Sequence, residues 1–288
     1  MKKINRDSCV YEMNAGNKPV LHVSPKEQVV FETWDALHSR KRTENGVEYT
    51  DYNPAAGPVY VDGAEPGDIL SVRIDKIEVE SKGVVVCGPE MGTLCKILDK
   101  SASKEIKIEN GMAIFSDKIK LPLNKMIGVI GTAPTDEIIP NSTPDYHGGN
   151  LDCKEVREGA TVLLPVFVSG ALLALGDLHA VMADGEIGMS GLEICGCVTV
   201  TIDVIKDEKL PLPMIVNDEY IMTLASHVDL DIAVEMATEN MVRYLESKNF
   251  DLYDAVMLVS MIGDVQICQV VDPKKTIRVS FPKYAIIN

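Results

Sequence analysis

Residues 170–200, GALLALGDLHAVMADGEIGMSGLEICGCVTV, are apolar enough to form part of a protein core, yet they carry several acidic side chains. The side chains in this segment that can bind a metal ion are Asp177, His179, Asp184, Glu186 and Glu193. No lysine or arginine occurs from Glu158 to Ile205. A carboxylate buried without a partner is unfavourable, so it takes up a proton, pairs with a positive group or binds a cation. The segment therefore predicts buried strands beside a cation-binding site.

Strand signals overlap both ends of this segment and also occur upstream of it. Residues 155–180 and 193–205 contain nearly continuous apolar runs, which are typical of buried strands. Residues 67–80, GDILSVRIDKIEVE, alternate between apolar and polar side chains, as a half-buried strand does. Residues 104–115, KEIKIENGMAIF, place Asn-Gly between two short strands and so predict a hairpin. We therefore expect a mainly β body with sandwich or barrel elements over residues 1–208, and this body carries the site.

The pattern changes after the proline-rich residues 209–216, KLPLPMIV. Residues 229–249 predict a helix that begins at Asp229 or Asp231 as its N-cap. Its expected apolar stripe consists of Ile232, Val234, Met236, Met241, Val242 and Leu245. Residues 251–265 predict a second helix that ends near Gly263, and strands are expected after it. The sequence thus predicts a smaller C-terminal α+β part over residues 209–288.

Composition and charge disfavour several classes of partner and of cellular location. The formal net charge is -15, which disfavours nucleic acid and anionic membranes because either would require a positive patch. The longest apolar run, residues 161–176, is interrupted by proline, serine and glycine and is too short to span a bilayer. The start of the chain lacks the apolar core of a signal peptide. The cysteines are scattered and odd in number, seven in all, which favours reduced thiols and a cytoplasmic location.

Two motifs inside the opening segment carry the strongest chemistry. In GDLHA, Asp177 and His179 point to the same face of an extended chain, so they can converge on a metal such as zinc. In ADGE, Asp184 and Gly185 form a turn signal that presents Glu186 in the same region. Each motif has a simpler reading: a surface aspartate with a hydrogen-bonded histidine, or an exposed acidic hairpin. The apolar flanks favour the metal site.

A third motif lies upstream in residues 144–156, PDYHGGNLDCKEV. His147 precedes Gly148 and Gly149, whose backbone can approach a ligand closely, and Asn150 and Asp152 follow them on one face. The N–H groups of the paired glycines are candidates for binding an oxyanion. The simpler reading is a polar loop with a glycine turn.

These motifs together resemble a known family. H-G-G-N-x-D at residues 147–152, followed by G-D-x-H-A-x-x-x-D-G-E at residues 176–186, resembles the acetamidase/formamidase family of metal-dependent hydrolases of small amides. VFETWDA at residues 30–36 and PGDIL at residues 66–70 are similar to early segments of that family. The resemblance extends from about residue 20 to the C-terminus.

The resemblance implies a divalent metal, expected to be zinc, with calcium as the alternative for a second or structural ion. It also implies a homodimer or a dimer of dimers. The residues expected around the metal are Asp35, Asp152, Asp177, His179 and Glu193. In longer members of the family Gln-Gly precedes D-G-E, whereas this chain has Met182 and Ala183 there. Met182 is therefore expected to alter the substrate pocket.

We expect hydrolysis of a formamide-like or acetamide-like amide to a carboxylate and ammonia. Glu186 is the expected general base, with Asp184 beside it and His147 stabilising the oxyanion. Gly148, Gly149, Asn150 and Met182 are the expected substrate-binding residues. Three alternatives stay open at this point: a metal-binding β-protein of the same family without catalysis or with another specificity, a Cys153–His nucleophile, and a protein-interaction module.

Overall fold

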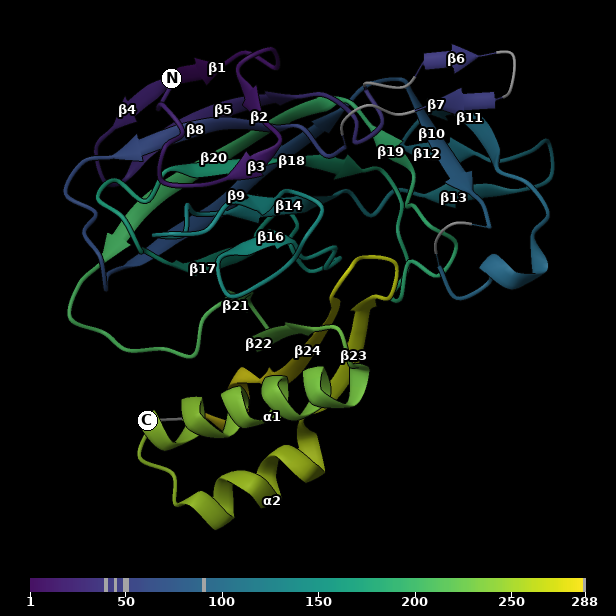
Figure 1. The fold of residues 1–288 in the computed structure, drawn as a ribbon. Coiled ribbons are helices and arrows are strands. Elements are labelled where there is room, and N and C mark those ends of the chain that lie inside the picture. The colour runs from purple at the N-terminus through teal and green to yellow at the C-terminus, as the bar shows by residue number, and fades with distance from the viewer. Residues whose placement is uncertain (39–40, 44–45, 49–51, 90–91, 287–288) are drawn as a thin grey trace.

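The computed structural model describes residues 1–38, 41–43, 46–48, 52–89 and 92–286. Two large β-sheets pack against each other, and two helices cover the C-terminal strands at one end (Figure 1). The mainly β fold predicted from the sequence is therefore confirmed, as is the smaller C-terminal α+β part.

Nine strands form the first sheet. Their order is β1 (Lys2–Ile4), β5 (Glu27–Thr33), β20 (Gly196–Ile205), β9 (Ile69–Val79), β17 (Thr161–Pro165), β21 (Met214–Val216), β22 (Tyr220–His227), β24 (Lys275–Pro282) and β23 (Asp264–Gln269). The C-terminal strands β21 to β24 thus extend the sheet of the N-terminal body, through the pairing of β17 with β21. The division at residues 208 and 209 stays a prediction.

Eleven strands form the second sheet. Its main order is β13 (Lys120–Pro122), β12 (Met112–Ile114), β11 (Ala102–Glu109), β10 (Lys82–Cys87), β19 (Glu193–Ile194), β18 (Leu173–His179), β14 (Met126–Gly131) and β16 (Gly148–Asn150). The other three are β8 (Ala55–Val61), β2 (Cys9–Val10) and β4 (Leu21–Val23). Strand β8 joins them to this sheet by pairing with β18, β2 and β4.

The remaining elements are short strand pairs and helices. They are β3 (Glu12–Met13) with β15 (Ile139–Pro140), β6 (Lys41–Thr43) with β7 (Gly46–Glu48), α1 (Leu230–Ser247), α2 (Leu252–Ile262), and the 3-10 turns Cys95–Ile97 and Lys283–Ala285. Among the described residues, no helix has the length and apolar character that crossing a bilayer requires.

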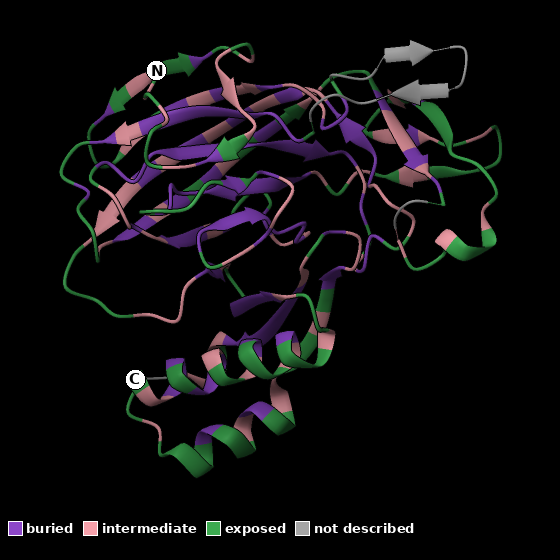
Figure 2. Ribbon diagram, in the orientation of Figure 1, coloured by how far each residue is buried: buried purple, intermediate pink, exposed green. Residues whose placement is uncertain are grey.

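The main core lies between the two large sheets (Figure 2). Alternate side chains of β9 and β20 are buried, because one face of each strand packs on the core and the other lies nearer solvent. All seven residues of β18 are buried, as the continuous apolar run predicted. Two of those seven, Asp177 and His179, are nevertheless ionisable, and each is at most 2% exposed.

The predicted hairpin and helix ends are confirmed. Glu109 pairs with Met112 across the turn, and Asn110 and Gly111 both have positive φ, at 52° and 74°, as the Asn-Gly turn of a two-residue hairpin requires. The Asp229 carboxylate accepts hydrogen bonds from two backbone N–H groups at the start of α1. Helix α2 ends before Gly263.

The buried face of α1 agrees with the predicted stripe in part, because Met241, Val242 and Leu245 are buried as predicted. Ile232 and Met236 are each 41% exposed, whereas Ala233 and Ala237 are fully buried. Helix α1 packs on β22 and β24, and the Thr223 hydroxyl of β22 donates a hydrogen bond to the Ala237 carbonyl. The small alanine side chains let the helix backbone approach the sheet, so the larger side chains beside them turn outward.

Candidate metal and active site

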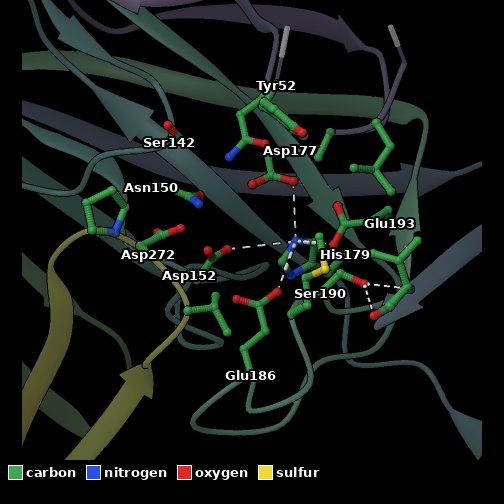
Figure 3. Close-up of a pocket in the computed structure, with 17 residues that line it drawn as sticks. Tyr52, Ser142, Asn150, Asp152, Asp177, His179, Glu186, Ser190, Glu193 and Asp272 are labelled. Carbon is green, nitrogen blue, oxygen red and sulfur yellow. Dashed lines mark hydrogen bonds and ion pairs between the residues drawn. The ribbon is translucent and has the colours of Figure 1, made fainter. Parts of the chain in front are cut away.

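A cavity of about 460 Å³ is lined by five of the predicted ionisable residues: Asp152, Asp177, His179, Glu186 and Glu193. Strand β18 supplies Asp177 and His179, and β19 supplies Glu193. Asp152 follows β16, and Glu186 lies in the loop after β18. These five side chains converge on one point, with His179 at the centre (Figure 3). The sequence motifs therefore meet in space although they lie on different elements.

The imidazole of His179 is surrounded by carboxylates. Its Nε2 lies 3.1 Å from Glu193 Oε1 and 3.3 Å from Asp177 Oδ1. The same atom lies 3.7 Å from Asp152 Oδ1 and 4.0 Å from Glu186 Oε1. Two groups of buried side chains therefore could hold a metal ion, Asp177–His179–Glu193 and Asp152–His179–Glu186, and both use His179. A nitrogen with carboxylate oxygens is a donor set that suits zinc.

The cluster has the properties of a cation site. One oxygen of each of the four carboxylates is buried without a hydrogen-bond partner: Asp152 Oδ1, Asp177 Oδ1, Glu186 Oε2 and Glu193 Oε2. A Cβ at Gly128 would lie 2.5 Å from Asp152 Oδ1 and 2.6 Å from Asp177 Oδ2, so only glycine leaves room beside them. One imidazolium cannot balance four buried carboxylates, whereas a divalent cation would satisfy their free oxygens.

The backbone is strained where it presents these acids. Asp152, Asp177 and Glu186 all have positive φ, at 40°, 57° and 43°. L-residues rarely adopt this conformation, and it persists at functional sites where the surrounding structure enforces it. Glu186 is held further by its own side chain, because Oε1 accepts a hydrogen bond of 2.6 Å from Gly191 N. The strain thus serves to direct carboxylates into the cavity.

Burial controls the electrostatics of the cluster. Burial raises the pKa of Glu186 to about 8, with His179 opposing the shift and Glu193 adding to it. Burial and the neighbouring acids also raise the pKa of Asp152 and Glu193 well above their ordinary values. Burial lowers the pKa of His179, but Glu193 and Asp177 outweigh it and raise that pKa well above 6.5. The positive charge of His179 therefore offsets only part of the cost of burying the neighbouring carboxylates.

Asp184, predicted to be catalytic, lies outside the cavity lining and pairs with basic groups. Arg278 of β24 donates from Nη1 and Nη2 to its two oxygens at 2.7 and 2.8 Å, and Lys154 Nζ lies 2.8 Å away. Burial alone would raise the pKa of Asp184, but the hydrogen bonds from Arg278 and Lys154 lower it. Residues 158–205 contain no lysine or arginine, so both basic partners of Asp184, Lys154 and Arg278, come from outside that segment.

Asp35, predicted as a metal ligand, also lies outside the cavity lining. Its Oδ1 accepts a hydrogen bond from Leu37 N at 3.0 Å, and Cys195 Sγ lies 3.6 Å from its Oδ2. These contacts turn the carboxylate back toward its own loop, whereas the next two residues, Ala36 and Leu37, line the cavity. Asp35 therefore positions the cavity wall.

Four further predicted residues lie behind the lining. His147 is fully buried, and burial lowers the pKa of its imidazole to about 4. Gly148 N donates to Asp145 O, and the two glycines, with φ of 99° and 82°, pack too closely against neighbouring carbonyls to allow a side chain. Met182 Sδ lies 3.1 Å from His179 Nδ1, so Met182 packs behind the imidazole rather than in the pocket. His147, Gly148, Gly149 and Met182 therefore do not line the cavity, where the predicted oxyanion and substrate-binding roles would require them.

The sequence reasoning missed Asp272, which lines the cavity beside Asn150. Asp272 is 8% exposed and lies in the β23–β24 loop, where Gln269 Oε1 accepts hydrogen bonds from Val271 N and Asp272 N. Burial, with Asp152 and Asp177 nearby, raises the pKa of Asp272 well above its ordinary value. Asn150 Oδ1 and Asp272 Oδ2 are left buried without partners. A carboxylate after the apolar run VQICQVV was the available signal.

Comparison with known proteins assigns the family. The sequence model of the Acetamidase/Formamidase family matches residues 16–145 and 139–286. The chain is 30% identical to a formamidase of Methylophilus methylotrophus over 75% of its own length and 72% of that protein. It is 28% identical to a Schizosaccharomyces pombe protein that carries a formamidase name, and it spans only about half of that relative (54%).

A solved structure agrees over nearly the whole fold. The crystal structure of an acetamidase from Bacillus halodurans superposes with a TM-score of 0.95 at 41% sequence identity, covering 98% of each chain. The family match covers more than half of this chain and includes both acidic motifs. This chain therefore belongs to the acetamidase/formamidase family of amidohydrolases.

Proposed function

We propose that this protein hydrolyses a primary amide to a carboxylate and ammonia with the help of a bound divalent cation, zinc. The observation that carries the proposal is the convergence of four buried carboxylates on His179, each with an unpartnered oxygen, where Gly128 leaves space beside them. The family membership supports the amide as the substrate. The nitrogen donor of His179 favours zinc over calcium, which takes oxygen ligands.

The distances favour one of the two candidate ligand groups. Glu193 and Asp177 lie closer to His179 Nε2 than Asp152 and Glu186 do. We therefore assign the cation to Asp177, His179 and Glu193, which leaves Glu186 free for acid–base chemistry. A divalent cation held there supplies polarisation of the amide carbonyl and a more acidic water.

Glu186 is the residue proposed to move the protons. Its Oε1 is fixed by Gly191 N, and its Oε2 has no partner. A positive ion bound beside it would offset the burial that raises the pKa of Glu186 and so favour its ionised form. Ionised Oε2 takes a proton from the attacking water while the new C–O bond forms, and it then gives that proton to the amide nitrogen as the C–N bond breaks. The products are the carboxylic acid and ammonia, and transfer of the acid's proton to ammonia leaves the carboxylate and ammonium.

Asn150 and Asp272 are proposed to hold the amide nitrogen. A primary amide carries two N–H donors, and Asn150 Oδ1 and Asp272 Oδ2 are two buried acceptors without partners on the same side of the cavity (Figure 3). Asp272 is held in its loop by its backbone N–H, which donates a hydrogen bond to Gln269 Oε1. This arrangement would select –NH2 over a substituted nitrogen.

The direct test of the proposed function measures ammonia release from formamide, acetamide and longer primary amides. Chelation of the purified protein is expected to abolish ammonia release, and zinc is expected to restore it. The His179→Ala variant is expected to contain little metal and to stay inactive after zinc is added. A metal-loaded protein that releases no ammonia from any of these amides would instead favour a metal that only stabilises the fold.

The substitution Asp272→Ala is expected to raise KM for a primary amide about tenfold and to change kcat less, because it removes one hydrogen bond to bound substrate. The same change at the exposed Asp117 is the matched control and is expected to leave KM unaltered. Steady-state kinetics checks both variants. An unchanged KM in Asp272→Ala would remove Asp272 from substrate binding.

The oligomeric state and the location stay predictions. Helix α2 exposes an apolar face that contains Tyr253, Val256, Met257 and Met261, which supports a homodimer or a dimer of dimers. All seven cysteines are free thiols, which supports a cytoplasmic location.

A further inference from the structure

The cavity lining combines acidic, polar and apolar side chains. Val271 and Pro273 flank Asp272 in the lining. A separate apolar group consists of Ala36, Leu37, Val86 and Met189, which we call the apolar wall. Ala36, Leu37 and Val86 form a hydrophobic cluster of their own, against which Met189 packs. A substrate that reaches the acids therefore also meets an apolar surface.

Hydrogen bonds fix the main chain of three residues of the apolar wall. Leu37 is fixed by the bond of its N–H to Asp35, and Ala36 is fixed by the bond that Asn53 N donates to its carbonyl at 3.1 Å. Val86 N donates to Ser190 Oγ at 3.0 Å, which ties β10 to the loop before Glu193. These hydrogen bonds fix the main chain of the wall residues, as in a preformed pocket.

Val86 of the apolar wall is hydrogen-bonded to Ser190, which lies across the acidic cluster from Asn150 and Asp272. Figure 3 shows Asn150 and Asp272 on one side of His179, and Ser190, the partner of Val86, on the other. An amide whose nitrogen faces Asn150 and Asp272 across the acids would direct its acyl group toward the apolar wall.

The cavity is also larger than the smallest amides need. Acetamide has four non-hydrogen atoms, which occupy about 120 Å³ if each receives the ~30 Å³ of a liquid water. The cavity volume is about 460 Å³, several times that value. Formamide offers no apolar group to the wall and acetamide offers one methyl group, so either would leave the wall in contact with water.

We propose that the preferred substrate is a primary amide whose acyl group is apolar and clearly longer than acetyl, with about four to six carbon atoms. This inference rests on the proposed amide hydrolysis and specifies its substrate class. Burial of each additional CH2 against the apolar wall favours the bound transition state by roughly fourfold. The acids provide the chemistry, and the wall selects the acyl chain.

The test compares kcat/KM for formamide, acetamide, butyramide and hexanamide on the metal-loaded protein. We expect kcat/KM to rise from acetamide to hexanamide by roughly fourfold per CH2, which over four CH2 groups is about two orders of magnitude. Ammonia from formamide and acetamide only, or equal kcat/KM along the series, would overturn this inference and leave amide hydrolysis standing. Ammonia from none of the four would overturn the proposed function and this inference together.

A wall variant separates the wall from a general preference for apolar amides. Ala36→Phe is expected to lower the ratio of kcat/KM for hexanamide over acetamide by at least tenfold, because the ring fills the space of the acyl chain. Ala102→Phe, at an exposed position of β11, is the matched control, and its ratio should equal that of the unchanged protein. If Ala36→Phe does not fold, Met189→Phe at the half-buried end of the wall gives the same comparison. A ratio unchanged in a folded wall variant would overturn the inference.

Discussion

Replacement of Glu186 by glutamine is expected to lower kcat for amide hydrolysis by about two to four orders of magnitude while the metal content per chain is unchanged. Glutamine can keep the hydrogen bond from Gly191 N that positions Oε1, so the side chain stays in place. It cannot take a proton from water, because an amide oxygen is a very weak base. Single-turnover kinetics and elemental analysis of the same sample measure the two quantities.

Glu193→Gln is the matched control, because it makes the same chemical change on the same cluster. Glu193 Oε1 lies 3.1 Å from His179 Nε2, against 4.0 Å for Glu186 Oε1. Loss of this carboxylate is therefore expected to lower the metal content, and zinc in excess should restore part of the activity. The reverse result, with metal lost in Glu186→Gln and kept in Glu193→Gln, would move the cation to the Asp152–His179–Glu186 group.

Replacement of Asp184 by alanine is expected to destabilise the fold by about 3–5 kcal/mol. The change leaves Arg278, whose side chain is 2% exposed, without the carboxylate that accepts its two hydrogen bonds. An unpaired buried guanidinium is costly because it loses both water and its counter-charge. Urea denaturation with a linear extrapolation measures the loss.

The double variant Asp184→Ala/Arg278→Met tests the stated cause. Removal of the guanidinium should recover most of the lost free energy of unfolding, since a neutral apolar pair no longer buries a charge. If the double variant is as unstable as Asp184→Ala alone, the loss does not come from the stranded Arg278.

The acid stability of the protein follows from the same pair. The hydrogen bonds from Arg278 and Lys154 place the folded-state pKa of Asp184 below its ordinary value of 3.8. A carboxyl group with a depressed pKa stabilises the fold above its unfolded pKa, and this contribution is lost as the pH falls through the folded value. The difference in stability between the unchanged protein and Asp184→Ala should therefore be constant near neutral pH and should shrink below pH 3.8.

Local signals predicted most of the secondary structure. Asn110-Gly111 indicated its hairpin and Asp229 its helix start, because both depend on residues within one turn of each other. The buried face of α1 was predicted in part. The apolar spacing selects Met241, Val242 and Leu245, which are buried, but also Ile232 and Met236, which are exposed. Contact with β22 and β24 selected Ala233 and Ala237 instead, and no local rule contains that contact.

Some residues of the candidate site were likewise indicated by local sequence, and others depend on contacts between distant parts of the chain. Asp177, His179 and Glu186 stood out because acidic groups occur in an apolar segment, and the structure brings them to one cavity. Asp184, two residues from Glu186, pairs with Arg278, which is 94 residues away in the chain. Asp272 comes from a loop of the C-terminal part, and its place beside Asn150 depends on the joining of β17 and β21 in one sheet.

The positions of strands and helices, and of the short motifs that carry the acidic groups, follow from local sequence, because hydrophobic periodicity, turn residues and caps act over a few residues. Which of those acids share a cavity, and which receive a basic partner, depends on long-range packing. The energy of a buried charge depends on what lies within about 4–6 Å of it, and those neighbours come from strands far apart in the chain.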